Sequence, residues 1–174
     1  FFILNFFIGQ ILALPKKRMI DAGEFHPAKR WEDFYAQMKN SIDLIFLGSS
    51  HCYRSFDPRI FDKALHINSF NMGSSEQSPL TSYYVLKEIL RSQKPQVVVL
   101  EVFWRTFDLK DQFVNATYNL EFIRSPDIRR EFLANGYSLK DRLNFLFPSY
   151  RYRKNLKDVV KLALKKKKKN ADEQ

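Results

Sequence analysis

The stretch Ile42-Asp-Leu-Ile-Phe-Leu-Gly-Ser-Ser-His51 decides how this chain is expected to fold. Its first six residues form a short apolar run that ends at Gly48, which is typical of a strand buried on both faces rather than of an amphipathic helix. A turn must follow, and Asp57 with Pro58 then forms the N-cap and first position of a predicted helix. The segment therefore predicts a buried strand, a turn and a helix in succession.

The same pattern continues along the chain. Residues 66–71 are the next predicted strand, closed by Met72-Gly-Ser-Ser75, and Ser78 with Pro79 begins a second helix. Residues 96–103 contain Val-Val-Val-Leu and form the third predicted strand. The intervals between strands are long enough for right-handed crossovers with a helix and too long for hairpins. The predicted fold class is therefore α/β with a parallel sheet.

After residue 105 the pattern weakens, and no fourth strand of the sheet is evident in the sequence. Helices are predicted near residues 127–134, 138–145 and 149–166. Because three parallel strands without further neighbours leave an apolar edge and uncovered faces, we expect poor solubility.

The composition of the 174 residues, with 45% apolar and 16% aromatic side chains, excludes an intrinsically disordered, collagen-like or disulfide-stapled protein. One domain of about 100 to 150 residues can bury a sizeable core. The single cysteine, Cys52, forms no intramolecular disulfide and does not indicate a redox compartment. No metal site and no cofactor are predicted.

An apolar run opens the chain, from Phe1 to Leu14, and proline and three basic residues follow it at positions 15–18. Fourteen residues of helix span about 21 Å, which is less than the hydrocarbon core of about 30 Å. We expect residues 1–14 to be part of a transmembrane helix or signal anchor, followed by a linker at residues 15–40. A buried core helix and a signal peptide are the alternatives. Orientation stays open, because the flank before the run is needed to decide it.

The net charge of +10 is concentrated near the C-terminus, where residues 146–174 carry ten basic and three acidic residues, a net +7. Residues 148–174 are predicted to be a basic helix and a lysine-rich tail. The block Lys165–Lys169 is expected to be a solvated helix end or disordered, with contact to anionic membrane or nucleic acid as the alternative. No zinc-ligand spacing, helix-turn-helix turn or ribonucleoprotein motif is present, so nucleic acid is not an expected partner.

Functional groups of a parallel α/β sheet gather at the carboxyl ends of the strands. Residues 48–51, 71–75 and 101–104 occupy these positions. A serine in a tight turn beyond a buried strand, with backbone N–H groups directed at the same point, suits acyl transfer, because the oxyanion needs preformed donors. The alternative is a structural one, because Gly-Ser-Ser is common in strand-to-helix turns that have no catalytic role. The Gly-x-Ser-x-Gly motif of the α/β-hydrolase nucleophile elbow is absent, because Cys52 occupies the position of its second glycine. The sequence also lacks the motif of a phosphate-binding loop.

Taken in order, Asp43–His51, Ser69–Ser74 and Pro95–Glu101 resemble the opening half of the SGNH/GDSL hydrolase superfamily. They are most similar to its membrane-anchored cell-envelope members, of the DltD-like and alginate-acetylation-like type. The resemblance covers residues 41–105. It implies a three-layer, flavodoxin-like sandwich with a parallel sheet, in a partial hydrolase domain at residues 41–147.

The resemblance also implies roles for individual residues. Ser50 falls on the family's nucleophile, with its own N–H as one oxyanion donor, Gly73 falls on a second donor, and Ser49 replaces the usual Asp. The family's third-block Asn has no counterpart in residues 101–104, and its Asp-x-x-His pair does not occur in this sequence. Without a base, a serine hydroxyl is a weak nucleophile. We therefore expect an N-terminal fragment that is inactive alone.

His51, Glu101 and Trp104 are the expected substrate contacts. Adjacent side chains on a turn seldom aim at one another, so His51 is not the expected base for the serine beside it. Glu101 is otherwise expected to buttress a backbone amide or Arg105. The remaining histidines are expected to be structural or solvated: His26 and His66.

The function expected from the resemblance is a serine ester hydrolase or O-acyltransferase acting on acylated cell-envelope glycans or lipids. The N-terminal helix would anchor it in the membrane, with its domain outside the cytoplasm. The alternative is a non-catalytic envelope assembly or carbohydrate-binding protein on the same fold, since the Asn, Asp and His are missing and Trp104 can stack on sugars. A third hypothesis gives the basic tail the main role, as a binder of anionic membrane.

Overall fold

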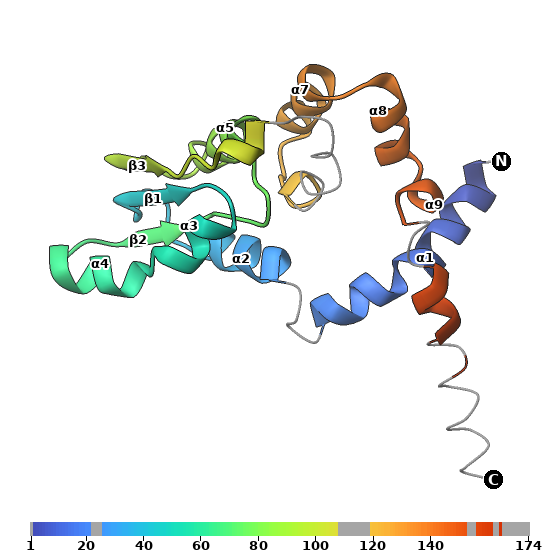
Figure 1. Cartoon of the computed structure of the whole chain (residues 1–174), viewed down its shortest axis with the longest axis horizontal. Coiled ribbons are helices and arrows are strands. Elements are labelled where there is room, and N and C mark those ends of the chain that lie inside the picture. The colour runs from blue at the N-terminus through green and yellow to red at the C-terminus, as the bar shows by residue number, and fades with distance from the viewer. Residues whose placement is uncertain (1, 22–25, 108–118, 153–155, 162–163, 165–174) are drawn as a thin grey trace, which may run out of the picture. The chain divides into compact units, whose positions relative to one another are not determined.

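The structure is a computed structural model that describes residues 2–21, 26–107, 119–152, 156–161 and 164 (Figure 1). The chain forms two compact units, Pro27–Tyr137 and Phe1–His26 with Ser138–Gln174. These boundaries differ from the predicted domain at 41–147 and from the predicted tail at 148–174. The block Lys165–Lys169 lies outside the described residues.

Three short strands form a parallel sheet in the Pro27–Tyr137 unit, in the order β2-β1-β3. In register, Ile45 of the central strand lies opposite Phe70 on one side and Val98 on the other. The predicted α/β class and its parallel sheet are confirmed. The strands lie within the predicted ranges: β1 (Leu44–Leu47), β2 (Ser69–Asn71) and β3 (Val97–Leu100).

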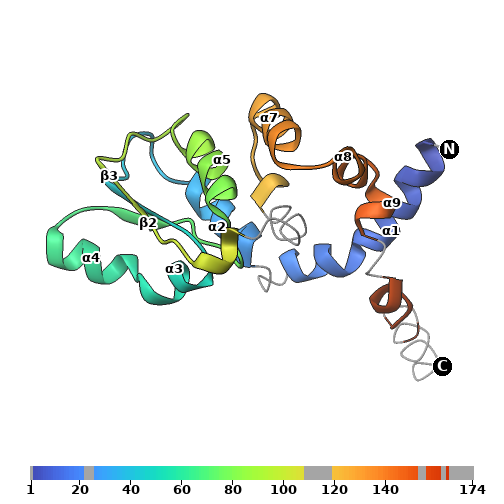
Figure 2. The same cartoon turned by 45° about the horizontal axis from the view of Figure 1, so that its top comes forward.

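Helices connect the strands as crossovers. Between β1 and β2 lie α3 (Ser50–Ser55) and α4 (Pro58–Leu65), and between β2 and β3 lies α5 (Pro79–Ile89). Because the two crossovers run in opposite directions across the sheet, a common right hand puts α4 and α5 on opposite faces, as Figure 2 shows. The predicted N-caps are confirmed, since Asp57 and Ser78 each accept a backbone N–H of the following first turn.

The central strand β1 is buried on both faces, as predicted. Side chains of Leu44 and Phe46 form a cluster with Cys52 of α3 on one face, where the Phe46 ring stacks on Phe56 at a centroid distance of 5.0 Å. Ile45 points to the other face and is fully buried. Because successive side chains of β1 point to opposite faces of the sheet, this one strand contributes to the apolar core on both faces.

Helix α2 (His26–Tyr35) lies within the stretch that the sequence predicted as a linker. Its Trp31 and Phe34 are each only 1% exposed, and Phe34 packs edge-on against Phe70 of β2 at 6.0 Å. The linker prediction at 15–40 thus differs from the structure. The apolar stripe of α2 consists of three aromatic residues within five positions, too short to be distinguished as a helical period in the sequence.

Strand β3 is an edge strand whose apolar side chains stay exposed. Val97, Val98 and Leu100 are 52%, 39% and 45% exposed. No further strand pairs with β3 within the part of the chain that the structure describes. This is the uncovered apolar edge expected from three parallel strands, and poor solubility stays a prediction from it.

Beyond β3 the unit continues with a 3₁₀ turn, η1 (Trp104–Phe107), and with α7 (Pro126–Gly136). Helix α7 lies against α5, where the Phe132 ring stacks on Tyr84 at 4.5 Å. The helix predicted near residues 127–134 is confirmed.

The other unit contains α1 (Phe2–Asp21), α8 (Leu139–Leu146) and α9 (Pro148–Arg151). Asn5 of α1 donates to the Ser149 hydroxyl at 2.6 Å, and a Cβ on Gly9 would clash with that of Pro148, so only glycine permits this approach. Helix α1 continues through Pro15 rather than ending there. Among the described helices, none combines the length and apolar character needed to cross a bilayer.

Candidate functional site

The carboxyl ends of the three strands meet at one edge of the sheet. The N–H of Ser74 donates to the Gly48 carbonyl at 3.0 Å, and the N–H of Glu101 donates to the Leu47 carbonyl at 2.8 Å. The segments that follow β1, β2 and β3 are therefore neighbours, as the parallel arrangement predicts. The candidate site consists of these segments and the side chains around them.

Ser50 is the first residue of α3, directly after the turn that ends β1. The side chain is half-buried. Its hydroxyl has no hydrogen-bond partner among the described residues, and its N–H, the first of the helix, has no intrahelical acceptor. Both groups that the resemblance assigns to catalysis are thus uncommitted within that part of the chain.

Ser49, by contrast, is fully committed to the fold. It is the N-cap of α3 and only 2% exposed. Its N–H and its hydroxyl both donate to Oε2 of Glu101, each at 2.7 Å. Glu101 therefore holds a backbone amide, which is one of the two roles expected of it, and it also fixes the Ser49 side chain.

Gly48 allows Glu101 to approach the turn so closely. Its backbone φ of +144° is a conformation that residues other than glycine rarely adopt. A Cβ added at this position would lie 2.7 Å from both Cβ and Oε2 of Glu101. Any larger residue at position 48 would displace the carboxylate from Ser49.

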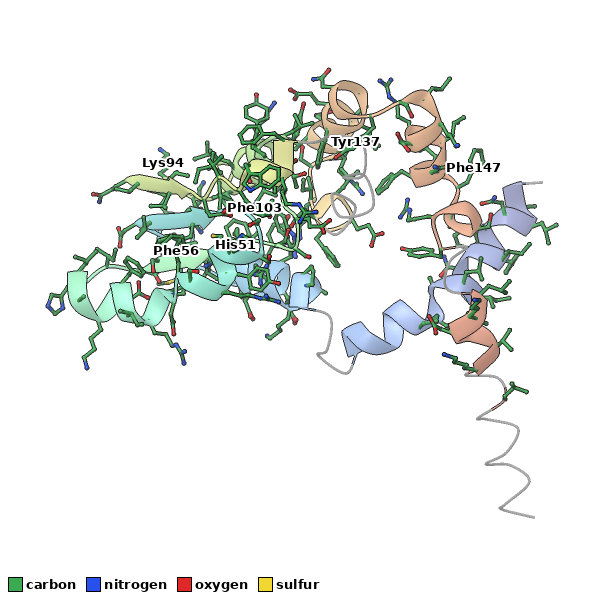
Figure 3. All side chains as sticks on the ribbon, in the orientation of Figure 1. His51, Phe56, Lys94, Phe103, Tyr137 and Phe147 are labelled. Atoms are coloured by element: carbon green, nitrogen blue, oxygen red, sulfur yellow. The ribbon has the colours of Figure 1, made fainter. Side chains whose placement is uncertain are left out.

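His51 lies beside this pair. Its Nδ1 is 3.2 Å from the Ser49 hydroxyl oxygen and 4.0 Å from Oε1 of Glu101. The imidazole packs edge-on against Phe103 at a centroid distance of 4.5 Å (Figure 3), and the His51 side chain is 56% exposed. The ring is therefore fixed on one side and open to solvent on the other.

Gly73 lies in the second segment, but its N–H is not free. It donates to Oδ1 of Asn71 at 2.9 Å, and a Cβ at Gly73 would come within 2.9 Å of the Cys52 sulfur. The short Asn71 side chain closes the turn on itself, which is a common property of this residue. The expected second oxyanion donor would have to leave Asn71 to bind an oxyanion.

Arg30 of α2 also reaches this edge, and sequence reasoning missed it because α2 was not predicted. Its guanidinium donates to the Gly73 carbonyl and lies 5.1 Å from the centre of the Tyr53 ring. Burial holds the pKa of the Arg30 guanidinium below its usual value. The residue places a positive charge beside the second strand end.

Trp104 follows Phe103 at the start of η1 and is 76% exposed, so its ring is available to solvent at the third strand end. His66 caps the C-terminus of α4 and is exposed. Within the described ranges, no three His, Cys, Asp or Glu side chains are grouped so as to hold a metal ion.

The Cys52 thiol is expected to react slowly in the folded chain. Burial, with a further contribution from Glu101, raises its pKa from 9.0 to about 12, which leaves little thiolate near neutral pH. At about pH 8 we expect the native thiol to react with a disulfide reagent at least about 100-fold more slowly than in urea. Equal rates in the two conditions would show that Cys52 is not buried.

The raised pKa of Cys52 also makes stability fall at high pH. Because the unfolded thiol releases its proton near 9.0 and the folded one near 12, unfolding becomes more favourable as the pH rises between these values. Alanine at this position has no proton to release. The Cys52→Ala variant should therefore show a smaller decrease than the wild type in the urea midpoint when the pH is raised from about 9 to about 10.5. Equal decreases in the two proteins would contradict this assignment.

Comparison of the chain with models of protein families, with curated proteins and with solved structures found no match.

Proposed function

We propose that this chain carries the nucleophile of an SGNH-like serine ester hydrolase or O-acyltransferase, with Ser50 as the nucleophile. The observation that carries the proposal is the difference between two adjacent serines. Ser49 is buried and donates its hydroxyl proton to Glu101, whereas the half-buried Ser50 hydroxyl has no partner among the described residues. A strand-end serine that takes no part in holding the turn is available for chemistry.

The chemistry proposed is transfer of an acyl group through Ser50. The Ser50 hydroxyl releases its proton to solvent as its oxygen attacks an ester carbonyl, and the oxyanion forms next to the Ser50 N–H. The bond between that carbon and the alcohol oxygen then breaks, and the alcohol oxygen takes a proton from solvent, which leaves an acyl-serine and the free alcohol. Water or a sugar hydroxyl then attacks the acyl-serine. The first acceptor makes the protein a hydrolase and the second makes it an O-acyltransferase.

The sheet order β2-β1-β3, with helices on both faces, supports a three-layer, flavodoxin-like sandwich as the frame of this site. The substrate class in this proposal is acylated cell-envelope glycans or lipids, because the motifs resemble membrane-anchored envelope enzymes. Anchoring through the N-terminal helix, an extracytoplasmic location and contact of Lys165–Lys169 with anionic membrane belong to the same proposal.

Labelling of the full 174-residue chain with a fluorophosphonate probe tests this function. The probe should label the wild type, and Ser50→Ala should lose at least about 100-fold of the labelling rate, because the variant lacks the hydroxyl that attacks the probe. Ser55→Ala is the matched control, since Ser55 is exposed at the far end of α3, outside the candidate site, and the substitution should leave labelling unchanged. Equal labelling of wild type and Ser50→Ala would contradict the proposal.

A second candidate function is carbohydrate binding without turnover, which the 76% exposure of Trp104 at the same edge favours. The same set of proteins separates the two functions. Glycan binding that is unchanged in Ser50→Ala, together with a wild type that the probe does not label, would favour the binding protein. Labelling that depends on Ser50 would exclude a purely non-catalytic role.

A further inference from the structure

The hydrogen bonds of the Ser49 hydroxyl determine which nitrogen of His51 carries a proton. A hydroxyl has one proton to donate and two lone pairs to accept with. Ser49 donates its proton to Oε2 of Glu101 at 2.7 Å and accepts the His51 backbone N–H at 3.2 Å. Only one lone pair then remains to face Nδ1 of His51, which also lies at 3.2 Å.

That contact is a hydrogen bond only if Nδ1 is the donor. The negative charge of Glu101, whose Oε1 lies 4.0 Å from the same nitrogen and beyond hydrogen-bond distance, favours the same assignment. The neutral imidazole then has its lone pair on Nε2. Since Ser49 engages the ring at Nδ1 and the side chain is 56% exposed, the lone pair on Nε2 is left for an incoming group.

An imidazole whose one nitrogen is bound by a group that a carboxylate fixes, with the other nitrogen free, is an arrangement that suits a general base. We infer that His51 is the general base of this site and that Glu101, acting through the Ser49 hydroxyl, is its positioning residue. The inference rests on the proposed function. It assigns a base within this chain, where the Asp-x-x-His pair of the resembling family is absent from the sequence, and so replaces the expectation that the chain is inactive alone.

The step assigned to His51 is activation of the incoming acceptor. Ser50 and His51 are successive residues of α3, so their side chains leave the helix about 100° apart and do not aim at one another. An acceptor hydroxyl arriving from solvent can instead meet Nε2. As its oxygen bonds to the acyl carbon on Ser50, its proton passes to Nε2, and the bond between that carbon and the Ser50 oxygen then breaks.

Protons balance over this step. The Ser50 oxygen regains a proton from solvent, and Nε2 returns to solvent the proton that it took from the acceptor. The products are the acylated acceptor, or the free acid when the acceptor is water, and the original enzyme. This acyl transfer changes no oxidation state, so it needs no oxidant or reductant.

Turnover of p-nitrophenyl acetate by the full chain separates this inference from the function on which it rests. His51→Gln should still release a first equivalent of nitrophenol and still be labelled at Ser50, but its steady-state rate should fall about 100-fold or more. His66→Asn is the control, since His66 is exposed at the end of α4 and the variant should keep the wild-type steady-state rate. A wild type that neither turns over the ester nor is labelled at Ser50 would contradict the proposed function. A His51→Gln variant with unchanged steady-state rate would overturn the base and leave that function intact.

Imidazole ¹⁵N chemical shifts give a readout that does not depend on turnover. The resonances of His51 are identified as those that are present in the wild type and missing in His51→Gln. In the wild type they should show a ring with its proton on Nδ1 and a lone pair on Nε2. Ser49→Ala removes the acceptor of that proton and should shift the ring toward the Nε2–H form. A wild-type His51 with its proton on Nε2 would overturn the inference even if the protein folds and is labelled.

Discussion

Replacing Glu88 by alanine is expected to destabilise the Pro27–Tyr137 unit by about 3 to 5 kcal/mol, because several donors that are buried or partly buried would lose the carboxylate that accepts them. Glu88 lies on α5 and is 2% exposed. Its carboxylate accepts the Tyr35 hydroxyl at 3.0 Å and the backbone N–H groups of Arg124 and Ser125 at 3.2 and 3.4 Å. One side chain thus joins α2, α5 and the start of α7.

The measurement is urea unfolding of the full chain, followed by tryptophan fluorescence. Glu88→Gln keeps an acceptor oxygen and should lose less stability than Glu88→Ala. Glu32→Ala is the matched control on α2, where the Glu32 side chain is 77% exposed and lies 3.9 Å from the Lys29 ammonium. The control should stay within about 0.5 kcal/mol of the wild type. A comparable midpoint for Glu88→Ala and Glu32→Ala would contradict the buried role of Glu88.

Replacing Trp31 by alanine should cost a similar amount, about 3 to 5 kcal/mol, through the lost apolar area and the cavity left behind. The indole is 1% exposed, and its Nε1–H donates to Oδ1 of Asn119 at 3.0 Å. Asn119 in turn donates to the Ser74 hydroxyl at 2.7 Å. The substitution therefore also weakens a polar network that reaches the loop after β2.

The chain has two tryptophans, and the other one is the control. Trp104 is 76% exposed, so Trp104→Ala should change stability by less than about 0.5 kcal/mol. Trp31→Phe keeps most of the apolar contact but removes the indole donor to Asn119, so an intermediate loss is expected. Circular dichroism in urea gives the midpoints of the wild type and the three variants. Equal midpoints for Trp31→Ala and Trp104→Ala would show that α2 does not pack as described.

The sheet could be predicted from the sequence because its signals are local. Each strand is an apolar run with a polar or glycine boundary, and the caps Asp57 and Ser78 mark the helices that follow. The exposed state of β3 could be anticipated only as a consequence of having three strands. Nothing in Val97–Leu100 itself distinguishes an edge strand from a central one.

Helix α2 and the anchoring of Ser49 could not be predicted in this way. Ser49 and Glu101 are 52 residues apart, and their contact exists only because β1 and β3 are adjacent and parallel. In the sequence, Ser49 stands where the resemblance implies an aspartate, and Glu101 lies in the stretch where the resemblance implies an asparagine. Only the folded chain shows that these two residues bind each other and that both lie beside His51.

The most direct test of this account is to locate the fluorophosphonate adduct on the full chain by peptide mass spectrometry. Trypsin releases Asn40–Arg54 as one peptide, and fragmentation within it separates Ser49 from Ser50. We predict that the phosphonate is on Ser50, because the Ser49 hydroxyl is buried and bound to Glu101. An adduct on Ser49 or on any residue outside this peptide, or no adduct at all, would contradict the account.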